Sequence, residues 1–142
     1  MTADLDITSL DLEEAAIYVL QGYPPVPAAP PAGSPDDVVA QIELLGESSA
    51  TMTITASAGA AASLAVAFFG TEVHELMPPD LPDAVKELAN VIGGAIKPLF
   101  GVTTTLSIPT IEVTEAGDGP SRASTTVAYA DGTISLRLRT LD

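Results

Sequence analysis

Cysteine and tryptophan are absent from the 142-residue sequence, and basic residues are few. Without cysteine the chain cannot form disulfides or use thiolate chemistry, and a zinc site is not expected. Only 5 Lys and Arg residues stand against 19 Asp and Glu residues, which gives a formal net charge of −14 at neutral pH. Nucleic acids and anionic membrane surfaces both require clusters of positive charge. The few scattered cations of this chain therefore exclude both kinds of partner.

Long apolar runs are missing as well. The longest, from Ala58 to Phe69, is interrupted by Gly59 and Ser63 and is shorter than the roughly 18 residues of a membrane span. The acidic start of the chain, Met-Thr-Ala-Asp-Leu-Asp, carries neither the basic nor the apolar block of a signal peptide. We therefore expect a cytoplasmic protein. Aromatic residues make up only 4% of the chain, so its core should consist mostly of Ala, Val, Leu and Ile.

The first part of the chain is predicted to hold one helix and a proline-rich connector. Apolar residues at helical spacing predict a helix over 12–20, with Asp11 and Glu14 as its capping box. Half of the 12 prolines lie in residues 24–35, where they oppose both helix and sheet. Because about 20 residues before this segment cannot build a core of their own, we take it as a connector inside a single domain, residues 1–142.

The rest of the chain alternates between predicted strands and helices. Two helices are expected, one between Ser57 as its N-cap and Gly70 as its C-terminal glycine, and a longer one from about Asp80 to Lys97. Strands are predicted over 38–45, 51–56, 103–114, 125–130 and 133–139, with Pro109 inside the third. This order predicts an α+β two-layer sandwich, an antiparallel sheet of about five strands with helices packed on one face.

The longest predicted helix separates an apolar face from a polar stripe. At about 100° per residue, Glu87, Asn90, Gly94 and Lys97 all fall within about 40° of Asp83, on the side opposite the core. A carboxylate and a carboxamide one turn apart have a possible joint chemistry. The carboxylate can grip a lysine of a partner, and the carboxamide can donate and accept hydrogen bonds at once to hold a water molecule. The alternative is a solvated helix face without function.

Two further residues can be interpreted either as functional or as purely structural. Gly94 lies inside a helix, where glycine is unfavourable. It is either tolerated near the frayed helix end before Pro98, or it lets the backbone of a partner approach closely. His74 is the only histidine, and a lone histidine with scattered carboxylates rarely builds a metal site, so we expect no metal in this chain.

The long helix also carries a resemblance. Asp83-Ala-Val-Lys-Glu87-Leu-Ala-Asn90 resembles the motif of the CheC/CheX/FliY phosphatase family, which is Asp or Ser, three residues, Glu, two residues, Asn and a downstream Pro. Pro109, in Leu-Ser-Ile-Pro-Thr, takes the downstream position, and Ala-Phe-Phe-Gly before the helix agrees with the family too. The resemblance covers about residues 38–138. A second motif copy is missing because Ala16 stands at its Asn position, so the chain is similar to the CheX type.

The resemblance implies a function. CheX-like proteins dephosphorylate the aspartyl phosphate of CheY-like receiver domains, and they tend to be homodimers. By resemblance, Glu87 would form a salt bridge with the active-site lysine of the receiver, and Asn90 would position the attacking water. Asp83, Gly94 and Lys97 would belong to the partner-binding surface. The chain would need no cofactor of its own, and the Mg2+ ion would belong to the receiver.

Two other functions remain open at this point. The same fold could bind a receiver without hydrolysing its phosphate, as an adaptor. Alternatively, the chain could be a structural oligomerisation module that works through its sheet edges. Edge strands leave backbone donors unpaired, and pairing with a second copy would satisfy them, which also favours a homodimer.

Overall fold

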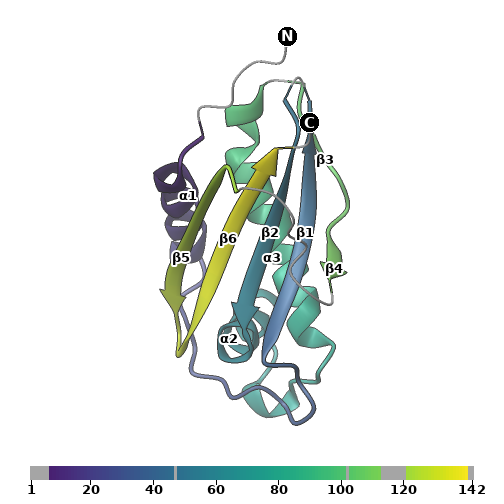
Figure 1. Cartoon of the computed structure of the whole chain (residues 1–142). Coiled ribbons are helices and arrows are strands. Elements are labelled where there is room, and N and C mark those ends of the chain that lie inside the picture. Colours follow the sequence, from purple (N-terminus) through teal and green to yellow (C-terminus); the bar gives the residue numbers. More distant parts are fainter. Residues whose placement is uncertain (1–6, 47, 102, 113–120, 141–142) are drawn as a thin grey trace.

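The computed structural model describes residues 7–46, 48–101, 103–112 and 121–140. Within this part of the chain, three α-helices pack on one face of a six-stranded antiparallel sheet, and no helix covers the other face (Figure 1). The helices are α1 (Ser9–Gln21), α2 (Ala58–Phe69) and α3 (Asp80–Ile96), with 3-10 turns η1 (Val73–Glu75) and η2 (Lys97–Phe100). The strands are β1 (Asp37–Leu45), β2 (Ala50–Ser57), β3 (Thr105–Leu106), β4 (Thr110–Glu112), β5 (Ala123–Tyr129) and β6 (Gly132–Thr140). The expected α+β two-layer architecture is confirmed.

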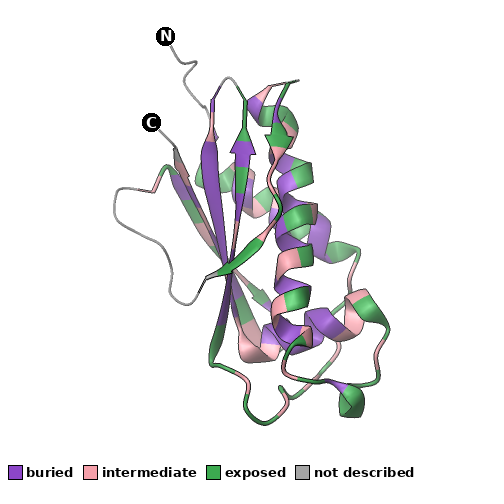
Figure 2. Cartoon of the chain, turned by 90° about the vertical axis from the view of Figure 1, so that its right-hand side faces the viewer, coloured by how far each residue is buried: buried purple, intermediate pink, exposed green. Residues whose placement is uncertain are grey.

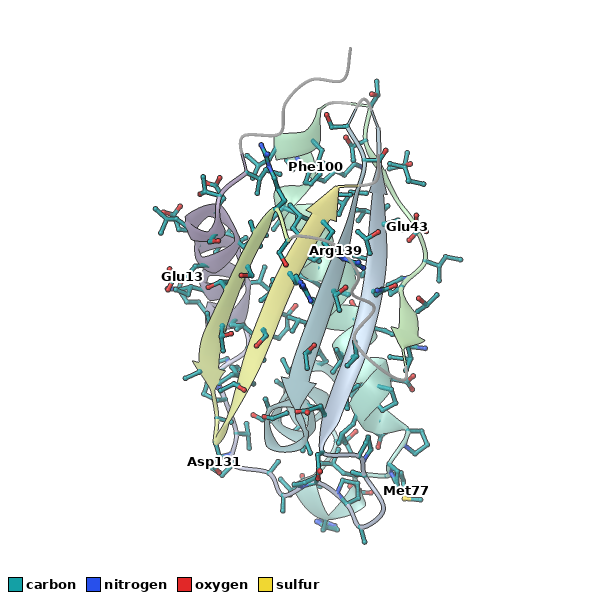
Figure 3. All side chains as sticks on the ribbon, viewed as in Figure 1. Glu13, Glu43, Met77, Phe100, Asp131 and Arg139 are labelled. Carbon is teal, nitrogen blue, oxygen red and sulfur yellow. The ribbon has the colours of Figure 1, made fainter. Side chains whose placement is uncertain are left out.

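The sheet has the order β3-β1-β2-β6-β5, and β4 also pairs with β1. Two hairpins, β1–β2 and β5–β6, form most of it. The second hairpin was predicted with its turn at residues 131–132, but the turn lies one residue earlier, at Ala130 and Asp131, and Gly132 already pairs with Tyr129. Alternate residues of each strand point to the helices, so Ile42 on β1, Met52 and Ile54 on β2 and Leu136 on β6 are almost fully buried. Figure 2 shows this buried layer between the sheet and the helices. Figure 3 shows Arg139 of β6 on the face without helices.

The prediction of one long strand over 103–114 was wrong. The structure has two short strands, β3 and β4, which pair with different parts of β1 and are separated by residues 107–109. Pro109 has no N–H to donate, so the ladder cannot run through it. Residues 113 and 114 lie outside the described part of the chain. The interruption leaves Ser107, Ile108 and Pro109 as a loop at the edge of the sheet.

The helix ends differ from prediction in two details. The capping box of α1 is formed by Thr8 and Asp11, and not by Asp11 and Glu14. The Thr8 N–H donates to Asp11 Oδ2 at 2.8 Å, and the Asp11 N–H donates to Thr8 Oγ1 at 3.2 Å. Ser57 is the N-cap residue of α2, but its side chain accepts from the Thr133 N–H instead. Gly70 ends α2 in the left-handed conformation that glycine favours, as predicted, with φ 65°.

The proline-rich connector is bonded to the rest of the molecule. The Tyr129 hydroxyl on β5 donates to the Tyr23 carbonyl at 2.6 Å, and the Val26 N–H donates to Ser63 Oγ on α2 at 2.8 Å. The Tyr23 ring also packs on Phe68, with ring centroids 4.4 Å apart. Tyr23, just before the connector, thus lies against the end of α2, and the connector itself is bonded to the middle of this helix at Ser63. None of the helices in the described ranges combines the length and the apolar character needed to cross a bilayer.

Candidate functional site

Helix α3 carries the polar stripe that the sequence predicts. The helix starts at Asp80, whose carboxylate accepts a hydrogen bond from the Met77 N–H at 2.8 Å. A carboxylate in this first turn also complements the partial positive charge of the helix N-terminus. The α-helix ends at Ile96, and Lys97 begins the 3-10 turn that contains Pro98. The proline thus ends the helix, as expected.

The two faces of α3 differ sharply in burial. The core face is fully or almost fully buried and consists of Leu81, Ala84, Val85, Leu88, Ala89, Ile92, Gly93 and Ile96. Asp83, Glu87, Asn90 and Gly94 are all exposed on the opposite side. The placement of these residues by helical periodicity is therefore confirmed.

A groove of about 680 Å³ runs between α3 and the 106–109 segment. Its lining combines the end of α2, one face of α3, the last residue of β3 and the loop that follows: Phe69, Asp83, Lys86, Glu87, Asn90, Leu106, Ser107, Ile108 and Pro109. Figure 2 shows the edge segment of β3 and β4 running alongside α3. The fold thus brings Pro109 next to Glu87 and Asn90, although it lies far from them in the sequence.

The second wall of the groove is fixed to strand β1. The Ser107 N–H donates to the Glu43 carbonyl at 2.9 Å, and the Glu43 N–H donates to Ser107 Oγ, also at 2.9 Å. Just before this point, Leu106 packs against α3 at Gly93. A Cβ atom on Gly93 would lie 3.4 Å from Leu106 Cδ2, at van der Waals contact. The wall therefore lies at contact distance from the helix at this point, with room for a side chain no larger than a methyl group.

Charge in the groove is mixed. Lys86 Nζ lies 3.5 Å from Asp83 Oδ1, in a pair that is largely open to solvent. In the part of the chain that the structure describes, no hydrogen bond or ion pair engages the side chains of Glu87 and Asn90. Both groups are therefore free to bind a partner or a water molecule.

Several residues that the sequence singled out lie elsewhere. Gly94 is exposed beside the groove but does not line it, and Lys97 is half-buried in η2. His74 is exposed in η1. Among the described residues, no group of three His, Asp or Glu side chains could hold a metal ion.

It was not predicted from the sequence that Phe69 and Ile108, two apolar residues, would line the groove. Exposure of an apolar side chain next to a site cannot be deduced from helical or strand periodicity. The only signal was indirect, because both residues belong to the short segments, Ala-Phe-Phe-Gly and Leu-Ser-Ile-Pro-Thr, that carry the family resemblance.

The chemistry of the groove needs a second molecule. The groove holds two carboxylates, Asp83 and Glu87, and the Asn90 carboxamide. Its hydroxyl residue, Ser107, accepts from the Glu43 N–H and donates to the Ile108 carbonyl, so it is not paired with a base as an activated nucleophile would be. Asn90 can orient a water molecule and Glu87 can attract a cation, and both act without covalent chemistry in this chain. Such an arrangement suits a site that a second molecule completes.

Known proteins resemble this chain in sequence and in fold. The family model "Chemotaxis phosphatase CheX" matches residues 38–123. CheX from Desulfovibrio desulfuricans is 20% identical with a TM-score of 0.63, over 92% of this chain and 96% of that chain. The CheX–CheY–BeF3–Mg2+ complex from Borrelia burgdorferi matches at 16% identity with a TM-score of 0.67, over 98% and 100%. A CheC-like protein from Shewanella oneidensis matches at 14% identity with a TM-score of 0.62, over 92% and 95%. No curated protein matches the sequence.

Proposed function

The chain belongs to the CheX family of chemotaxis phosphatases, and we propose that it hydrolyses the aspartyl phosphate of a phosphorylated CheY-like receiver domain. The observation that carries this proposal is the pair Glu87 and Asn90. Both side chains are exposed, both line one groove with Pro109, and no neighbour within the described residues occupies either of them. The complex of a CheX with CheY from Borrelia burgdorferi supports the choice of partner.

In this mechanism each of the two residues has one task. The Glu87 carboxylate contacts the lysine of the receiver and thereby sets the position of the phosphorylated aspartate over the groove. The Asn90 carboxamide accepts a hydrogen bond from a water molecule and donates one to it, and so holds the water in line with the phosphorus atom. The water oxygen attacks phosphorus while the bond to the carboxylate oxygen of the receiver breaks. Inorganic phosphate and the free aspartate result, and the proton of the water goes to phosphate or to solvent.

The receiver supplies the rest of the site. Mg2+ in the receiver neutralises charge on the phosphoryl oxygens when it is bound there. This chain would contribute only Glu87 and Asn90 to the reacting centre. An enzyme of this kind works by positioning, which alone can lower a reaction barrier by several kcal/mol.

We propose that the receiver also covers the rest of the polar stripe. Asp83 lies at one end, in the groove and beside Lys86, and Lys97 lies just beyond the other end of α3. Between them, Gly94 is exposed, and a Cβ atom added there would meet nothing within 4 Å. The missing side chain leaves room for the backbone of a partner to lie against the helix.

The direct experiment is the loss of phosphate from a panel of phosphorylated receiver domains, with and without this protein. We expect accelerated loss from at least one receiver. Binding of a receiver without faster phosphate loss would favour the adaptor function. If no receiver of the panel is bound or dephosphorylated, the structural module would be the remaining alternative.

We also propose that the chain forms a homodimer through the edge of β5. Within the described residues β5 pairs only with β6, so its other side carries backbone groups without a strand partner. Ser9 Oγ accepts from the Ser124 N–H at 3.0 Å, and strand alternation directs the backbone groups of Thr126 and Ala128 to the same side. Light scattering at micromolar concentration should give the mass of two chains, and a monomer mass would contradict this proposal.

A further inference from the structure

The loop at the edge of the groove exposes a large apolar side chain. Ile108 is 86% exposed, the highest fraction of any large apolar residue in the described part of the chain. An isolated exposed apolar residue on a surface needs no explanation. Ile108, however, lines the same groove as Glu87 and Asn90. A partner that binds at Glu87 and Asn90 would therefore also lie close to Ile108.

The segment that carries Ile108 is held in place on both sides by strand β1. On one side, Ser107 makes two hydrogen bonds of 2.9 Å to the backbone of Glu43. On the other side, the proline ring of Pro109 restricts its backbone, and Thr110 starts the pairing of β4 with β1. An apolar side chain held in place before binding loses little conformational freedom when a partner covers it.

A second apolar side chain lines the groove from helix α2. Phe69 is the last residue of α2 and is 46% exposed. Its ring lies 6.4 Å from that of Phe68, and Phe68 in turn packs on Tyr23, just before the connector. Phe69 therefore has an aromatic neighbour, Phe68, which is itself packed in place.

We infer that Ile108 and Phe69 are the docking residues that select the partner, through apolar contacts beside the reacting group. The inference rests on the proposed function, since it names the chemistry of the receiver surface. That surface would carry apolar side chains next to its phosphorylated carboxylate and its lysine. Ile108 and Phe69 would bind the apolar part, and Glu87 would bind the lysine. Asn90 and the two apolar residues line one groove, so a partner that fills this groove contacts all three.

The test measures initial rates of phosphate release over a range of receiver concentrations. The variants are Ile108→Ser and Phe69→Ser, and the control is Leu10→Ser. Leu10 on α1 is 59% exposed and does not line the groove, so its change removes a comparable apolar surface elsewhere. We expect Ile108→Ser to raise KM on the order of tenfold and Phe69→Ser to raise it less. In both variants kcat at saturating receiver should stay close to that of the parent, and Leu10→Ser should behave as the parent throughout.

The affinity for a receiver loaded with beryllofluoride gives a second readout, because it needs no turnover. It should weaken by the same factor as KM rises. An active parent with unchanged KM and unchanged affinity in Ile108→Ser would overturn this inference and leave the proposed function standing. The inference would also be overturned if Ile108→Ser or Phe69→Ser became monomeric but kept the KM of the parent, since the substituted residue would then contact a second copy of the chain. A parent that neither binds nor dephosphorylates any receiver would overturn both.

Discussion

Replacing Gly94 by leucine should separate helix stability from partner docking. Gly94 is exposed inside α3, and an added Cβ atom meets nothing within 4 Å, so a larger side chain has room in the free protein. Glycine in a helix is about 1 kcal/mol less favourable than alanine or leucine. Gly94→Ala and Gly94→Leu should therefore both raise the free energy of unfolding by up to about 1 kcal/mol, or the melting temperature by roughly 2–4 °C.

The two variants should differ only in docking. If the backbone of the receiver lies against α3 at this point, the leucine side chain blocks the approach and raises KM for the receiver roughly tenfold or more, by about 1.4 kcal/mol per factor of ten. Gly94→Ala, with one methyl group, should have a much smaller effect. Urea unfolding and phosphate release measured on the same preparations decide the matter. A stable Gly94→Leu protein with the KM of the parent would refute the close approach, and the glycine would then be merely tolerated.

Two further predictions concern a buried hydroxyl and the acidic anchor. Burial raises the pKa of the Tyr129 phenol above its ordinary value of about 10. The unfolded chain therefore loses this proton first, so the free energy of unfolding should fall as pH rises above about 10. In Tyr129→Phe, the contribution of this group to the fall in the free energy of unfolding at high pH should disappear. At neutral pH the same variant should be about 1 kcal/mol less stable than the parent, because the Tyr23 carbonyl loses its donor. If urea unfolding showed that the free energy of unfolding falls equally with pH above about 10 in parent and variant, Tyr129 would not be the group responsible. Glu87→Ala should raise KM for the receiver and change stability by less than about 0.5 kcal/mol, since the side chain is exposed; a stability loss above that would show a structural role.

The face that α3 exposes could be predicted from the sequence because the information is local. Apolar residues at helical spacing define the core side, and this places Asp83, Glu87 and Asn90 together on the other side. The hairpin of β5 and β6 follows in the same way from the adjacent pair Asp131-Gly132, although its turn lies one residue earlier, at Ala130 and Asp131. Each prediction depends on residues within a few turns of one another.

The second wall of the groove depends on pairing between distant segments, and no local pattern contains it. Leu106 reaches α3 only because β3 pairs with β1 at Leu44. Pro109 marks a break in strand pairing, but the position of Ile108 beside α3 depends on how β3 and β4 pair with β1 on either side of that break. The same holds for Gly93. It lies on the buried face of α3, and only the pairing of β3 with β1 brings Leu106 beside it.

The central claim, that Asn90 holds the attacking water, is tested most directly by the rate of phosphate loss from a saturating phosphorylated receiver with the parent and with Asn90→Ala. Asn90 is exposed and makes no hydrogen bond within the described residues, so the substitution should leave the fold intact. Loss of one positioned hydrogen-bonding group should lower kcat on the order of 100-fold or more. Affinity for the beryllofluoride-loaded receiver should stay within about twofold of the parent, because by this account docking depends on Glu87 and the groove walls and not on Asn90. An Asn90→Ala protein with the kcat of the parent would contradict the catalytic role and favour an adaptor.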